Sequence, residues 1–174
     1  QLLSEAVKKQ RTESSGTQLD IQKDQLFDVR IDLPLNAYIP ENYINDLAAR
    51  LKIYQRLSQF MSIEDLMALS EEIADRFGSI PEPVLALIDL IAIKSLSKQC
   101  DIESIAKVNG KIVLQVRQQI GGAKLAIGKA LGETVQVGNN QIRLTFDDQW
   151  RKNIIDILKR LWDFQNGIKA LIGD

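Results

Sequence analysis

The hydrophobic pattern of this chain changes near Cys100, from the spacing of α-helices to the spacing of β-strands, and this change limits the possible folds. Between residues 41 and 98, apolar residues recur at steps of three and four positions, as they do on one face of a helix. After Cys100, two pairs of short apolar runs are each separated by a turn sequence, Asn109-Gly110 and Gly138-Asn139-Asn140. Asn-Gly between apolar runs is a strong β-hairpin signal. The sequence therefore predicts an α+β fold.

Three helices are predicted before this change. The first follows Pro40 and spans about Glu41 to Phe60. Its expected buried stripe consists of Tyr43, Leu47, Leu51, Tyr54 and Leu57. The second begins after Ser62, which suits an N-cap, and ends at Gly78, which suits the left-handed position after a helix. The third spans about Glu82 to Lys98 and is apolar on nearly all sides, so we expect it to be the most buried.

A helix, a linker and a strand are predicted ahead of these three helices. Residues 1–10 read as a short amphipathic helix, which we expect to belong to a region upstream. Residues 11–25 are polar and have no sustained period, as in a mobile linker. Alternation of apolar and polar residues from Phe27 to Leu33 predicts a half-buried strand, which Pro34 ends. Residues 26–174 are therefore expected to form one domain.

Two β-hairpins and two helices are predicted after Cys100. The hairpins are expected at residues 105–116 and 135–146, with a short helix at 122–131 between them. A closing helix, capped by Asp147 or Asp148, is expected to run to about Gln165. Its apolar side consists of Trp150, Ile154, Leu158, Leu161 and Trp162.

The chain contains no histidine and only one cysteine, Cys100, which excludes several kinds of catalytic and metal site. Without histidine there is no Ser-His-Asp triad, no histidine acid–base catalysis and no histidine-ligated zinc. A single thiol forms neither an internal disulfide nor a cysteine cluster, and it is compatible with a reducing cytoplasm. Asp147 and Asp148 could bind magnesium, but adjacent carboxylates at a helix start are more simply explained as caps. The sequence therefore predicts no catalytic residue and no metal site.

Phosphate-binding loops are also missing. A Walker A loop has four residues between its glycines and ends in Gly-Lys-Ser or Gly-Lys-Thr. Five residues separate Gly122 from Gly128, and neither Gly128-Lys129 nor Gly110-Lys111 is followed by a hydroxyl residue. The longest apolar stretch, Pro83 to Ile93, is too short to span a membrane. We therefore expect neither nucleotide binding nor membrane insertion.

The charges are distributed unevenly, although the net charge is only −1. Residues 41–90 contain nine acidic and four basic residues, whereas residues 94–129 contain seven basic and two acidic residues. Such an asymmetry can mark two binding surfaces, or it can reflect ordinary variation among solvated faces. The basic region lacks interleaved aromatic residues, which argues against binding of single-stranded nucleic acid.

One charged group lies beside the buried stripe of the helix predicted over residues 62–78. At about 100° per residue, Leu66, Leu69, Ile73 and Phe77 share one side of that helix. Glu72, Asp75 and Arg76 occupy an adjacent sector about 100° wide. Two interpretations remain open at this point. The sector is either a solvated face with an intrahelical Glu72–Arg76 ion pair, or a contact with a partner.

Several motifs of the first half resemble a known family. In chain order they are Leu2-Leu3-Ser4-Glu5-Ala6-Val7, Ala37-Tyr38-Ile39-Pro40-Glu41-Asn42-Tyr43-Ile44, Arg50-Leu51 with Tyr54, and Asp75-Arg76-Phe77-Gly78 with Pro81. They are similar to the C-terminal domain of bacterial transcription-repair coupling factor (Mfd), and the opening motif is similar to the segment that leads out of that protein's motor. The resemblance covers roughly Asp28 to Phe164. After Cys100 it rests on the hairpin pattern alone.

This resemblance implies a role in nucleotide excision repair. The family's parent protein is a cytoplasmic, ATP-driven DNA translocase that removes stalled RNA polymerase at lesions and recruits UvrA. Its C-terminal domain is regulatory and needs no cofactor, because ATP and magnesium are used only in the motor domains. That domain docks on an N-terminal UvrB-like module and masks the surface that UvrA binds. By this likeness residues 26–174 are the regulatory domain, and residues 1–10 remain from the motor region.

Carried over by position, the partner-interface residues implied by the resemblance are Glu72, Asp75 and Arg76. Ala74 stands where many relatives have a larger apolar residue, so packing beneath the contact is expected to differ slightly. Two other functions stay open. A DNA-binding accessory module would use the basic region 94–129, and its affinity would depend on salt concentration. A structural brace would bind the motor tightly and leave the UvrB-like module unbound.

Overall fold

The computed structural model describes residues 29–59 and 62–172, so the helix predicted over residues 1–10 and the linker over 11–25 lie outside the described residues. Helices and strands follow one another in the predicted order, which confirms the α+β fold class. The elements are β1 (Arg30–Asp32), α2 (Leu47–Ser58), α3 (Ile63–Phe77), α4 (Glu82–Gln99), β2 (Ile102–Val108), β3 (Lys111–Val116), a 3₁₀ turn (Gly121–Ala123), α5 (Lys124–Leu131), β4 (Val135–Val137), β5 (Gln141–Thr145) and α6 (Trp150–Ile172).

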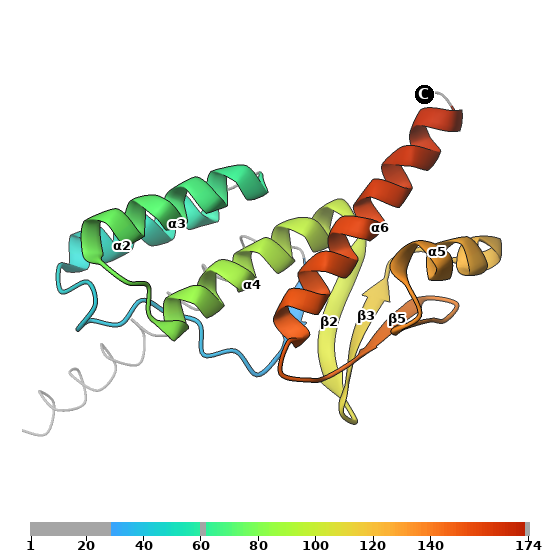
Figure 1. Ribbon diagram of the computed structural model, residues 1–174, viewed down its shortest axis with the longest axis horizontal. Helices are drawn as coiled ribbons and strands as arrows, with labels where there is room; N and C mark the ends of the chain where they lie inside the picture. The colour runs from blue at the N-terminus through green and yellow to red at the C-terminus, as the bar shows by residue number, and fades with distance from the viewer. Residues whose placement is uncertain (1–28, 60–61, 173–174) are drawn as a thin grey trace, which may run out of the picture.

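The described strands form a five-stranded sheet in the order β1-β2-β3-β5-β4. Figure 1 shows β2, β3 and β5 side by side in this sheet. β2 and β3 make the first predicted hairpin, and its turn residues Asn109 and Gly110 have φ values of 49° and 72°. These left-handed conformations are the ones that Asn-Gly adopts in a two-residue turn. β4 and β5 make the second hairpin, and antiparallel pairing of β3 with β5 joins the two hairpins. β1 pairs with β2 in parallel at the outer edge.

A first hydrophobic core lies between this sheet and helices α4, α5 and α6. Alternate residues of a strand point to the same face of a sheet, so the period-two pattern directs its apolar residues toward the helices. Leu114 of β3 pairs with Ile105 of β2 on one side and with Ile142 of β5 on the other, and all three are buried. The helices contribute Ile93, Leu96, Ile127, Leu131, Ile154, Leu158 and Leu161.

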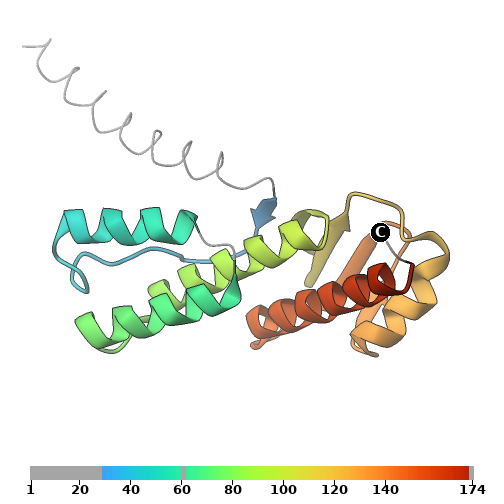
Figure 2. The ribbon, with the colours of Figure 1, turned by 90° about the horizontal axis from the view of Figure 1, so that it is seen from above.

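A second hydrophobic core lies among α2, α3 and the first part of α4, to one side of the sheet (Figure 2). Its buried residues include Ile53, Leu57, Leu66, Leu69, Ile73, Val84 and Leu87. Helix α4 is long enough to serve both cores, because Leu87 belongs to the second core and Ile93 to the first. α4 therefore connects the helical part of the molecule with the sheet.

The prediction for α2 is wrong at the start of the helix and on part of its buried face. The helix begins at Leu47, whereas the sequence pattern suggested Glu41. Leu47 and Leu51, expected in the core, are 59% and 42% exposed. Leu57 of the predicted stripe is buried, and Tyr43 and Tyr54 are partly buried against the second core. The buried face of the helix also includes Arg50 and Ile53, which the pattern did not indicate.

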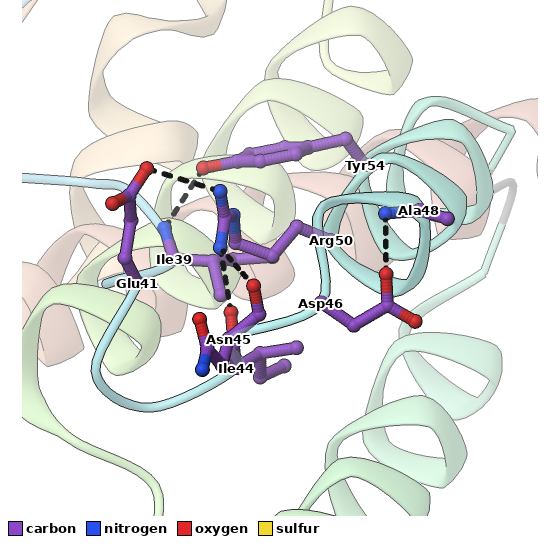
Figure 3. Close-up of polar contacts among 8 residues, drawn as sticks. All are labelled: Ile39, Glu41, Ile44, Asn45, Asp46, Ala48, Arg50 and Tyr54. Atoms are coloured by element: carbon purple, nitrogen blue, oxygen red, sulfur yellow. Dashed lines mark hydrogen bonds and ion pairs between the residues drawn. The ribbon is translucent and has the colours of Figure 1, made fainter.

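Arg50 explains why the chain before α2 is not helical (Figure 3). Its guanidinium donates hydrogen bonds to the backbone carbonyls of Ile44, at 2.7 Å, and Asn45, at 3.2 Å. In a helix that started at Glu41, these two carbonyls would accept hydrogen bonds from backbone N–H groups four residues later. Here the Arg50 side chain donates to them instead. Asp46 then caps the helix, since its carboxylate accepts a hydrogen bond from the N–H of Ala48 at 2.9 Å.

Two other predicted boundaries also change. The described part of the early strand is short, because β1 pairs with β2 only from Arg30 to Asp32. Helix α6 continues to Ile172, beyond the predicted end at Gln165. Just before its start, Asp147 accepts a hydrogen bond from the N–H of Gln149 at 2.9 Å, which holds the turn that leads into the helix. Among residues 29–59 and 62–172, no helix combines the length and apolar character needed to cross a bilayer.

Candidate partner-binding interface

Helix α3 carries the three candidate interface residues, and both of its ends are set as the sequence predicts. The Ser62 hydroxyl accepts a hydrogen bond from the N–H of Asp65 at 3.1 Å, which caps the N-terminus. Gly78 ends the helix with a φ of 85°, a conformation that favours glycine. Of the predicted stripe, Leu66, Leu69 and Ile73 are buried and Phe77 is partly buried against the second core. This arrangement leaves the charged sector outside the core.

Glu72 is held by two arginines, only one of which the sequence suggested. Arg76, four residues along α3, lies 3.5 Å from Glu72 Oε1. Arg56 of α2 makes the closer contact, with its two terminal nitrogens each 2.8 Å from a different oxygen of the carboxylate. Such a two-point arginine–carboxylate contact is stronger and more directional than a single ion pair. Sequence reasoning missed Arg56 because nothing in the pattern of α2 indicates which helix it faces.

The hydrogen bond from Arg56 is the main reason why the pKa of Glu72 is lowered from its ordinary value of 4.5. Arg76 lowers this pKa further, while partial desolvation acts in the opposite direction. The same contact raises the pKa of Arg56. Glu72 is therefore a charged link between α2 and α3 at neutral pH.

Arg76 lies on the surface next to an ordered aromatic pair. Its guanidinium carbon is 5.1 Å from the centre of the Phe77 ring, a cation–π distance, and its side chain is 60% exposed. Phe77 meets Tyr43 edge-on at 6.2 Å, and the Tyr43 hydroxyl donates to the carbonyl of Gly78 at 2.9 Å. The aromatic contacts thus support one side of Arg76 and leave its hydrogen-bond donors accessible.

Asp75 is the third candidate, and it is exposed on the outer side of α3. Within the part of the chain that the structure describes, its carboxylate makes no hydrogen bond or ion pair. The structure therefore brings the three residues together on one helix surface, but their surroundings differ. Glu72 is bound within the domain, whereas Asp75 and most of the Arg76 side chain face solvent.

Cys100 is buried inside the first core, where its side chain is part of the packing. Its thiol donates to the carbonyl of Leu158 at 3.3 Å. Burial, with a smaller contribution from Asp163, raises the pKa of the thiol to about 12. A thiol with so high a pKa is almost entirely protonated at neutral pH and is a poor nucleophile.

The basic residues of region 94–129 are spread over α4, β2, β3, the loop after β3, and α5. At least three of them contact groups of the domain itself. Lys107 lies 3.6 Å from the centre of the Phe146 ring, Lys111 donates to Gln136 at 3.0 Å, and Arg117 is 3.5 Å from Asp101. The tryptophans of the closing helix face the first core, where Trp150 is buried and Trp162 is partly buried. They offer no exposed platform for stacking on bases.

Comparison with known proteins identifies a family match and related proteins. Residues 33–124 match the model of the TRCF domain family. The chain is 28% identical over 176 residues to the transcription-repair-coupling factor of Bacillus subtilis (strain 168), a match that covers 94% of this chain and 14% of the relative. It is 30% identical over 169 residues to that of Staphylococcus aureus (strain USA300), covering 91% of this chain and 14% of the relative.

A solved structure has the same fold. The crystal structure of a C-terminal domain of transcription-repair coupling factor matches with a TM-score of 0.69 and 20% sequence identity. The match covers 81% of this chain and 96% of that domain. The chain thus spans 14% of the length of the two curated relatives and shares its architecture with a domain of this kind.

Proposed function

The chain belongs to the TRCF domain family, and from this membership we propose that it is a non-catalytic interaction domain of a longer transcription-repair coupling factor. The name of its relatives implies a role in DNA repair. In the proposed function, the longer protein is an ATP-dependent DNA translocase that displaces stalled RNA polymerase and recruits UvrA. The present domain docks on the N-terminal UvrB-like module, covers its UvrA-binding surface, and keeps the resting protein inhibited.

The observation that carries this proposal is the pair of opposite charges that α3 presents to solvent. Asp75 and Arg76 are adjacent and exposed, and they lie outside the buried stripe of the helix. A partner must offer a basic group to one and an acidic group to the other. Complementary charges of this kind determine which partner binds, and in which orientation, more than they raise affinity. A surface with both signs therefore suits a domain that must dock in one defined position.

A double charge reversal tests the proposed contact. We expect Asp75→Arg combined with Arg76→Asp to weaken binding to the isolated UvrB-like module at least tenfold, about 1.4 kcal/mol. The melting temperature should barely change, because both side chains lie on the surface. Titration calorimetry between this chain and the module, together with thermal unfolding, measures both quantities.

A second reversal on another face is the matched control. Arg30 and Glu103 form an exposed ion pair at 3.4 Å between β1 and β2. Exchanging their charges (Arg30→Glu with Glu103→Arg) should leave docking unchanged. If the α3 reversal leaves docking intact and lowers the melting temperature instead, Asp75 and Arg76 serve the fold and the proposed contact is wrong.

The full-length protein offers an independent measurement. The docked state, which covers the UvrA-binding surface, is in equilibrium with an undocked state that exposes it. Weaker docking should therefore increase UvrA binding. We expect the α3 reversal to raise UvrA affinity in the full-length protein, and the Arg30/Glu103 reversal to have no such effect. Unchanged UvrA affinity despite lost docking would contradict the masking role.

The two alternative functions make different predictions. For a DNA-binding module, the basic region 94–129 should give sub-micromolar affinity at about 150 mM salt, with a linear dependence of log affinity on log salt. We expect micromolar or weaker binding, since at least three of those bases already contact groups of the domain. A structural brace would bind the motor region tightly and show no affinity for the UvrB-like module.

A further inference from the structure

Glu72 stands between two arginines that compete for the same carboxylate. Its Oε1 atom is 2.8 Å from Arg56 Nη1 and 3.5 Å from Arg76 Nη1. Arg56 also binds the second oxygen at 2.8 Å, whereas Arg76 touches only one oxygen at the limit of hydrogen-bond distance. Arg56 is therefore the principal partner of Glu72, and the contact with Arg76 is secondary.

Arg56 determines how strongly Glu72 attracts Arg76. A carboxylate whose two oxygens already accept hydrogen bonds from a guanidinium has little unsatisfied charge to offer. If Arg56 were absent, Arg76 would be the remaining cation paired with Glu72 among the described residues. A glutamate and an arginine four residues apart on a helix face form an ion pair readily. Arg76 would then be drawn along the surface of α3, away from a partner.

We propose that Arg56 is a positioning residue of the docking contact, which satisfies Glu72 and thereby leaves Arg76 available to the partner. This inference rests on the proposed docking function. It changes the roles within the sector, because Glu72 acts inside the domain, and the groups that meet the partner directly are Asp75 and Arg76. The partner surface then presents an acidic group to Arg76 and a basic group to Asp75.

The aromatic residues beside Arg76 support this arrangement. The guanidinium lies 5.1 Å from the Phe77 ring, which is fixed in turn by its edge-on contact with Tyr43. A planar cation resting on a ring keeps its in-plane N–H donors free for a carboxylate. Because Arg56 is the principal partner of Glu72, this aromatic support and the secondary contact with Glu72 at 3.5 Å together hold Arg76 before a partner binds. Pre-organisation of this kind reduces the entropy that docking would otherwise lose.

A set of four variants tests the inference through binding to the UvrB-like module. We expect Arg56→Ala to weaken docking at least threefold, because Glu72 captures Arg76. Adding Glu72→Gln to Arg56→Ala should restore docking to within twofold of the unmodified chain, since the capturing charge is gone. Glu72→Gln alone should change docking less than twofold. Arg56→Lys keeps the charge but not the two-point contact, and it should give an intermediate affinity.

Controls separate positioning from folding. Arg56 is 40% exposed, so the variants should stay folded, and thermal unfolding of each one checks this. Arg30→Ala removes the arginine of another surface pair with a glutamate and should not affect docking.

The results distinguish this inference from the proposed function. If Arg56→Ala docks normally, or if Glu72→Gln fails to restore it, the positioning role is wrong. In that case the loss of docking on reversal of Asp75 and Arg76 would still support the proposed function. If the unmodified chain does not bind the module at all, both are wrong.

Discussion

At the scale of single residues, Arg50 shows how a charged side chain can be part of a core. It lies on the buried face of α2 and is surrounded by the backbone carbonyls of Ile44 and Asn45, with Glu41 at 3.1 Å (Figure 3). The Tyr54 hydroxyl accepts the N–H of Ile39 at 2.8 Å and fixes the same segment from the other side. Residues that carried the family resemblance thus hold the chain before α2 in place.

We therefore predict that Arg50→Ala lowers the free energy of unfolding by about 2–3 kcal/mol, because buried carbonyls lose their hydrogen-bond donors. Urea denaturation measures this change. Glu41→Gln is the matched control, since the Glu41 side chain is 85% exposed and its surface ion pair contributes little. Equal losses of stability in the two variants would show that the Arg50–Glu41 ion pair, and not the hydrogen bonds to the backbone carbonyls, accounts for the contribution of Arg50.

Cys100 provides a second test at this scale. Its pKa of about 12 leaves about one thiol in ten thousand ionised at pH 8, and the side chain is buried. The folded protein should therefore resist a thiol reagent under conditions in which the urea-unfolded chain reacts fully within minutes. Absorbance of the released thiolate measures both rates. Rapid, complete labelling of the folded chain would contradict the burial of this residue.

At the scale of elements, the link between α2 and α3 should depend on pH. Glu72 has a lower pKa in the folded chain, mainly because Arg56 donates to it. A carboxyl of this kind stabilises the fold at pH values above its ordinary 4.5, and this contribution is lost as pH falls through the lowered value. Glu72→Gln should accordingly reduce stability at about pH 7 and have no effect at about pH 2.

Urea unfolding over a pH series measures this difference, and Glu71→Gln, at the exposed neighbouring position, is its control. A stability difference between Glu72→Gln and the unmodified chain that persists at the lowest pH would show that packing of the side chain, and not its charge, is responsible.

Local signals in the sequence predicted the elements whose ends depend on neighbouring residues. Ser62 and Gly78 defined α3, and Asn109-Gly110 defined the β2–β3 hairpin, because caps and tight turns act over a few positions. The start of α2 was wrong because the Arg50 side chain supplies hydrogen bonds that no pattern of apolar residues reveals. The helical period also assigned Leu47 and Leu51 to the core, but both are exposed, because the buried side of the helix is centred on Ile53.

The same limit applied to the candidate site. Spacing on α3 grouped Glu72 with Arg76, and the family resemblance singled out these residues with Asp75. The stronger partner of Glu72 comes from another helix, sixteen positions away in the sequence. The parallel pairing of β1 with β2 is likewise set by contacts between distant segments. Such contacts depend on how whole elements pack, so they lie beyond what local patterns indicate.

At the scale of the whole molecule, the two hydrophobic cores share one helix. α4 contributes Leu87 to the helical core and Ile93 to the core beneath the sheet. Ile63 and Ile155 pack against both cores, and Arg151 of α6 lies 3.3 Å from Asp89 of α4. These contacts predict that the helical part and the sheet unfold together as one cooperative unit.

The two tryptophans allow a direct test of this cooperativity, because both lie on α6 and face the sheet core. Leu87→Ala removes a buried side chain from the helical core and should destabilise the protein by about 2–4 kcal/mol. If α4 couples the cores, tryptophan fluorescence and far-ultraviolet circular dichroism should shift together to lower urea concentration, although Leu87 belongs to the other core. Leu125→Ala, at an 81% exposed position on α5, should shift neither signal. A fluorescence transition that stays in place in Leu87→Ala, while part of the helical signal is lost earlier, would show that the surface carrying Asp75 and Arg76 unfolds independently of the sheet.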